Sequence, residues 1–84
     1  MLMRTNLVVS YVDKFGELIN QPERALEVEK LLLSVPDPQT FERIRALFYK
    51  KFRNPLLTTF LNELKPDHHI RILNAYRYAT RDYY

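Results

Sequence analysis

The part of the chain that decides the fold is SVPDPQTFERIRALFYKKFRNP, residues 34–55. It contains the same helix-start signal twice, first as Asp37-Pro38 and then as Asn54-Pro55. In each pair, the short polar side chain is of the kind that caps the first turn of a helix. The proline that follows is tolerated because its missing amide hydrogen would have no partner in that turn. The sequence therefore predicts one helix that begins at Pro38 and another that begins at Pro55.

Between these two signals the apolar side chains recur with the period of an α-helix. A rotation of about 100° per residue places one group of them on a single side, namely Phe41, Ile44, Leu47, Phe48 and Phe52. Residue 35 precedes a proline and so avoids helical backbone angles, which predicts that the preceding helix ends there. The helix that begins at Pro38 is expected to run to about Arg53.

Prolines mark two further helix starts, at Pro22 and Pro66. The helical period gives an apolar side to five segments in all: 6–20, 22–35, 38–53, 55–64 and 66 onward. In the last of these, the apolar side is formed by Ile72, Leu73, Tyr76, Ala79 and Tyr83. Connections of two to four residues are typical of helices that pack antiparallel to their neighbours. We therefore predict an all-α fold, a compact bundle of four to five short helices that forms one domain over residues 1–84.

The first two segments differ from the others. In 6–20, Gly16 lies beside the apolar side, where its missing side chain permits the close approach of another helix. A short strand at the start of this segment is left open as an alternative. In 22–35, apolar residues wrap most of the circumference: Leu26, Val28, Leu31, Leu32, Leu33 and Val35. So wide an apolar surface is typical of the central helix of a bundle, or of a helix that also contacts a second subunit.

Composition argues against most catalytic and cofactor sites. Glycine occurs once and cysteine is absent, which excludes glycine-rich phosphate loops, disulfides and cysteine metal sites. Ser10 and Ser34 lie within predicted helices, without the strand-turn-helix context of a serine nucleophile. His68 and His69 are adjacent, so on a helix their rings point about 100° apart and do not meet on one metal ion. We predict that the protein is not an enzyme and uses no cofactor, metal ion or small-molecule substrate.

The apolar run near the N-terminus is short. Leu7, Val8 and Val9 are followed by Ser10 and Asp13, which is too soon for a secretory signal or a membrane span. The absence of cysteine fits a reducing compartment. We therefore expect a cytoplasmic protein with no membrane partner.

Charge is distributed unevenly along the chain. Residues 1–35 carry a net charge of −1, whereas residues 43–81 hold nine basic and two acidic side chains. The residues that we predict to bind a partner lie on the outer sides of the third and fifth helices: Arg43, Lys50 and Arg53, and Arg71, Arg77, Tyr78 and Arg81. Arginine and tyrosine on one helix face can pair with carboxylates or phosphates and can stack on bases. The alternative is a solvated basic surface without a partner.

These observations favour a small non-enzymatic interaction or regulatory module that binds another macromolecule, with a protein as the expected partner. The hydrophobic content of 46% is generous for 84 residues, so self-association as a homodimer is a second form of this hypothesis. The alternative is a nucleic-acid-binding protein that uses the basic faces of the third and fifth helices. A viral or mobile-element accessory protein is the origin that we suggest for such a chain.

Overall fold

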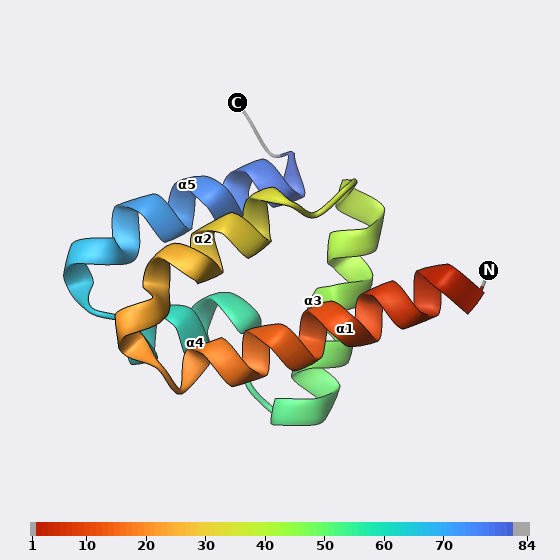
Figure 1. Cartoon of the computed structure of the whole chain (residues 1–84), viewed down its shortest axis with the longest axis horizontal. Helices are drawn as coiled ribbons and strands as arrows, with labels where there is room; N and C mark the ends of the chain where they lie inside the picture. The colour runs from red at the N-terminus through yellow and green to blue at the C-terminus, as the bar shows by residue number, and fades with distance from the viewer. Residues whose placement is uncertain (1, 82–84) are drawn as a thin grey trace.

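The fold consists of five α-helices over residues 2–81, the part of the chain that the structure, a computed structural model, describes (Figure 1). The helices are α1 (Leu2–Ile19), α2 (Ala25–Leu33), α3 (Pro38–Phe52), α4 (Leu56–Glu63) and α5 (His69–Thr80). One 3-10 turn, Pro22–Arg24, leads into α2, and another, Pro66–His68, leads into α5. No strand occurs in this range, so the predicted all-α bundle is confirmed, and the alternative of a strand at the start of the first segment is wrong.

The proline signals mark helix starts, in three different ways. At α3 the prediction is confirmed in full, because Pro38 is the first helical residue and the Asp37 carboxylate accepts a hydrogen bond of 2.7 Å from the Thr40 amide. Pro22 and Pro66 each begin a 3-10 turn that runs directly into the α-helix. At α4 the prediction that Asn54 caps the helix is wrong. Pro55 itself occupies the N-cap position in an extended conformation, and no side chain caps the turn.

Two helices end on arginine instead of glycine. Arg53 follows α3 with a φ of 62°, and Arg81 follows α5 with a φ of 57°. This left-handed conformation closes a helix by presenting an amide to the last carbonyl groups, and it costs a residue with a Cβ atom about 1 kcal/mol. The single glycine lies within α1 and is used for packing, so both helix ends adopt this conformation with a bulkier residue.

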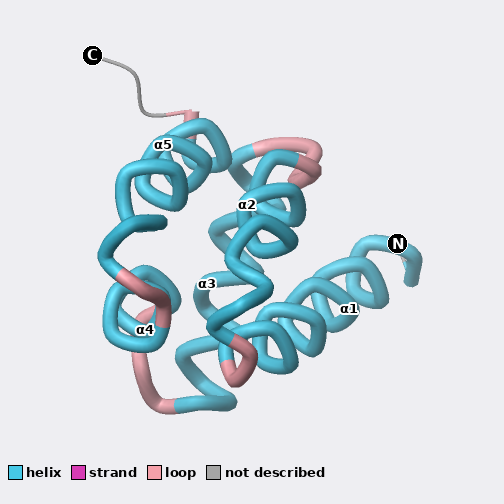
Figure 2. Tube along the Cα trace, turned by 60° about the vertical axis from the view of Figure 1, so that its left-hand side comes forward, coloured by secondary structure: helices cyan, strands magenta, loops and turns pink. Residues whose placement is uncertain are grey.

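The helices form two pairs, α2 with α5 and α1 with α3, and the contact of α1 with α2 joins the two pairs. Figures 1 and 2 show α2 and α5 side by side, and α1 crossing α3. Helix α1 also contacts α2, where the Tyr11 hydroxyl donates a hydrogen bond of 2.9 Å to the Ser34 carbonyl oxygen. The α1–α3 pair carries an ion pair of 2.9 Å between Asp13 and Lys51.

Over residues 2–81, no helix has both the length and the apolar character that a membrane crossing requires.

The core is built around four fully buried phenylalanine rings: Phe15, Phe41, Phe48 and Phe60. Phe15 of α1 and Phe60 of α4 have ring centroids 5.5 Å apart, so the long first helix packs directly on the short fourth one. In α5, Ile72 and Ala79 are buried as predicted, while Leu73 and Tyr76 are partly buried. Residue 83, also predicted on this apolar side, lies outside the described residues.

Gly16 permits the close packing of α1 on α3 that the sequence predicts. A Cβ atom at this position would overlap the ring of Phe52, which lies against the helix at this point. Phe52 is nevertheless 38% exposed, so its ring covers α1 from the edge of the core. It was predicted to point inward, and it does so only in part because α3 ends at this residue.

Helix α2 uses only part of its wide apolar surface for the core. Ala25, Val28 and Leu32 are buried between α1 and α5, which fits the predicted central position of this helix. Leu26 and Leu33 lie on its other side and are 50% and 45% exposed, respectively. The helix also ends at Leu33, two residues before the predicted end. The apolar surface of α2 is therefore wide because the helix carries apolar residues on two sides, one in the core and one facing solvent.

We expect Leu32→Asp to unfold the protein, because Leu32 has no exposed surface and burying an unpaired carboxylate costs several kcal/mol. Ile70→Asp is the matched control, since Ile70 is 73% exposed on α5 and a surface change of this kind alters stability by about 0.5 kcal/mol or less. Thermal unfolding followed by circular dichroism measures both. A Leu32→Asp variant that melts together with the control would contradict the placement of α2 in the core.

Candidate binding surface on α2 and α5

Three of the predicted partner-binding residues line one surface hollow between α2 and α5. These are Arg71, Arg77 and Tyr78, and the hollow measures about 420 Å³. The opposite wall comes from α2, through Glu29 and Leu33. The structure therefore brings the α5 residues together as one surface, because they share the side of α5 that borders α2.

A second hollow continues this surface toward the start of α5. It is lined by Leu26 and Glu29 of α2 and by His68 and Arg71 at the start of α5. Glu29 and Arg71 belong to both hollows. We call the combined surface the α2–α5 face. Its members are Leu26, Glu29, Leu33, His68, Arg71, Asn74, Arg77 and Tyr78.

The centre of the α2–α5 face is an ion pair. Arg71 Nη2 lies 3.2 Å from Glu29 Oε1, and the Glu29 side chain is only 19% exposed. The guanidinium group is the more exposed partner, so the Coulomb attraction is partly screened by water and the pair adds little to stability. Its effect is to hold a carboxylate and an arginine in fixed positions between two exposed leucines.

Arg81 is held by its own chain. Its guanidinium group lies 4.3 Å from the centroid of the Tyr78 ring. It also donates hydrogen bonds to the carbonyl oxygens of Val35, at 3.4 Å, and Pro36, at 3.3 Å. These contacts fasten the end of α5 to the connection between α2 and α3, and they fix the Tyr78 ring at the edge of the α2–α5 face.

The three predicted residues on α3 lie apart from the α2–α5 face. Arg43, Lys50 and Arg53 are exposed, and none of them forms an ion pair with another described residue. Arg45 of α3 and Tyr76 of α5 take part in the contact between these two helices. The Arg45 guanidinium lies 5.3 Å from the Phe41 ring centroid and 5.9 Å from that of Tyr76. The seven predicted residues therefore form two groups.

The predicted site residues include none of the members of the α2–α5 face that lie on α2, namely Leu26, Glu29 and Leu33, and they also omit His68 and Asn74. The two leucines belong to the wide apolar surface of residues 22–35, which also fitted a contact with a second subunit. That pattern was the available signal. Apolar periodicity shows which residues avoid water, but it does not show whether the fold supplies enough neighbours to cover them.

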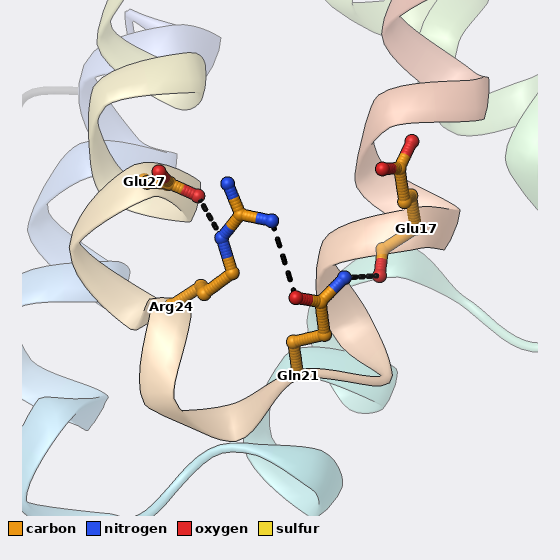
Figure 3. Close-up of polar contacts among 4 residues, drawn as sticks. All are labelled: Glu17, Gln21, Arg24 and Glu27. Atoms are coloured by element: carbon orange, nitrogen blue, oxygen red, sulfur yellow. Dashed lines mark hydrogen bonds and ion pairs between the residues drawn. The ribbon is translucent and has the colours of Figure 1, made fainter.

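A further hollow, on the other side of α2, is lined by mixed charges. It measures about 440 Å³ between α1 and α2, with Leu18 and Leu31 among its lining residues. Figure 3 shows its polar edge, where Arg24 lies between Glu27 and Gln21. The hydrogen bond from Arg24 lowers the pKa of Glu27, and the Coulomb attraction between the two charges acts in the same direction. Both effects also raise the pKa of Arg24.

The described residues offer no cluster of three His, Asp or Glu side chains that could hold a metal ion. The two adjacent histidines have separate environments. His68 lines the α2–α5 face, and the His69 ring nitrogen lies 3.1 Å from the Leu64 carbonyl oxygen.

No protein-family model, curated protein or solved structure matches the chain.

We expect Arg24→Gln to raise the pKa of Glu27 toward the ordinary value of a glutamate, because the substitution removes the positive charge beside it. In the wild-type protein the lowered pKa means that the pair stabilises the fold above the unfolded-state pKa of Glu27. That contribution is lost as the pH falls through the folded-state value. An NMR titration of the Glu27 side-chain carboxyl carbon measures both proteins. Identical titration curves would contradict the pairing.

Proposed function

We propose that this protein is a small non-enzymatic interaction module that binds another protein through the α2–α5 face. The observation that carries the proposal is the pair of half-exposed leucines, Leu26 and Leu33, beside Arg71, Arg77 and Tyr78. Arginine and tyrosine are enriched among the residues that dominate protein–protein binding energy, and apolar side chains form the centre of such interfaces.

The two leucines supply a driving force for association. Complete burial of a leucine side chain contributes about 1.5–3 kcal/mol. Since Leu26 and Leu33 are about half exposed, covering both yields roughly 2 kcal/mol by the same measure. The Tyr78 ring, which is 40% exposed, adds further apolar area at the edge of the face.

A second candidate function is nucleic-acid binding by the outer side of α3. The observation that favours it is that Arg43, Lys50 and Arg53 are exposed and unpaired among the described residues. Such cations are available to phosphate groups. The candidate is weaker than the first because Arg71 and Arg81 of the fifth helix are engaged with Glu29 and with backbone carbonyl groups. The continuous basic surface that it requires is correspondingly reduced.

Site-specific photo-crosslinking in the cells that produce the protein tests both functions. A diazirine amino acid is placed at Leu33 on the α2–α5 face, at Ala46 between Arg43 and Lys50, or at exposed Asn62 on α4 as the control. We expect a protein adduct from Leu33 only, because only this position faces the proposed partner. Gel mobility and mass spectrometry identify the adduct, which is either a second copy of the chain or another protein.

Two outcomes would contradict the proposed function. A Leu33 probe that gives no more protein adduct than the Asn62 probe would show that the α2–α5 face does not bind protein. An adduct with DNA or RNA at Ala46, without one to protein at Leu33, would replace the proposal with the second candidate.

A further inference from the structure

We propose that the groove between α1 and α2 binds an amphipathic helix of another protein through an acidic residue at the middle of that helix. The groove consists of two adjoining hollows, of about 440 Å³ and about 160 Å³, which share Lys14, Leu31 and Ser34 as lining residues. It has no lining residue in common with the α2–α5 face. The inference therefore goes beyond the proposed function and adds a second partner site.

The register of α1 against α2 places two lysines at one level of the groove. The two helices run in opposite directions (Figure 1), and the Tyr11 hydroxyl of α1 contacts Ser34 of α2. About one turn further along α1 is Lys14, and about one turn back along α2 is Lys30. Both lysines are exposed, and both line the larger hollow. The middle of the groove thus has one ammonium group on each rim.

Apolar side chains line the groove along its length. Leu31 belongs to both hollows, Leu18 lines the larger one, and Leu7 lines the smaller one. From Leu7 to Leu18 the groove extends about 16 Å at a rise of about 1.5 Å per residue. That length matches three turns of a bound helix, which would have apolar residues on either side of its middle.

The two lysines at the middle are available to a partner. Neither Lys14 nor Lys30 forms an ion pair with another described residue. The third cation of the groove, Arg24, already has Glu27 as its partner. A carboxylate placed between the two lysines would have an ammonium group on both sides, and opposite charges that meet across an interface select the partner and fix its register.

The end of the groove near the α1–α2 connection has the opposite charge. Glu17 and Glu27 line this end together with one cation, Arg24. A partner helix therefore complements the groove when it has a basic residue about one turn from its acidic residue, on the side of this connection. Apolar residues two turns apart, with the acidic residue between them, provide the spacing by which amphipathic helices bind grooves.

Site-specific photo-crosslinking from the groove tests the inference in the cells that produce the protein. A diazirine amino acid replaces Ser10, which is exposed and lines the smaller hollow, and exposed Asn62 on α4 is the control. Mass spectrometry of the digested adduct identifies the segment that is attached. We expect a segment of another protein with an acidic residue between apolar residues at helical spacing.

A synthetic peptide of the crosslinked segment then tests the two lysines. We expect the double substitution Lys14→Gln and Lys30→Gln to weaken peptide binding at least tenfold, as measured by fluorescence anisotropy, because both ammonium groups beside the carboxylate are lost. The matched control is Lys50→Gln with Lys65→Gln, which removes the same charge from exposed positions elsewhere and should bind as the wild type does. Circular dichroism confirms that both variants are folded.

Exchange of the acidic residue of the peptide for its amide completes the test. This exchange should weaken binding to the wild-type protein at least tenfold and should have little further effect on the Lys14 and Lys30 double variant. Such non-additivity is the mark of two groups that interact directly.

Any of three results would overturn the inference. The first is a Ser10 probe that gives no more protein adduct than the Asn62 probe. The second is an adduct with a second copy of this chain, or with a segment that has no acidic residue between apolar ones. The third is equal peptide binding by the two double variants. The proposed function is tested at Leu33, which does not line the groove, so either proposal can fail without the other.

Discussion

The constraint on which the rest of the structure depends is that nine residues of α2 must close the core between α1 and α5. Val28 and Leu32 meet it, since both are completely buried. Through them, the α2–α5 pair is joined to α1 and so to α3 and α4. A small domain buries a modest fraction of its surface, so each fully covered side chain in this short helix is needed to hold the two helix pairs together.

The same constraint explains why the protein has an apolar surface available for binding. One helix can direct only part of its circumference toward the core, yet α2 is apolar around most of it. The described helices cover only part of the side that carries Leu26 and Leu33, which are 50% and 45% exposed. A neighbouring ion pair, Glu29 with Arg71, lies at the same surface. The α2–α5 face is thus a direct consequence of a largely apolar helix that directs only one of its sides toward the core.

Much of the fold could be predicted because it depends on local rules. The Asp37-Pro38 signal and the spacing of Phe41 and Phe48 involve residues a few positions apart, so the sequence alone was sufficient. The same holds for the α5 part of the binding surface, whose members share one helix face. What could not be predicted depends on distant segments. The hydrogen bonds of Arg81 to the α2–α3 connection and the exposure of Leu33 follow only from where other helices lie.

The most direct test of the account is amide hydrogen exchange of the folded protein, followed residue by residue by NMR. If the nine residues of α2 close the core between α1 and α5, the amide of Leu32 should exchange only when the whole protein unfolds, as slowly as that of Phe48 in α3. Exchange of the Leu32 amide through a local opening of α2, much faster than that of Phe48, would contradict the account.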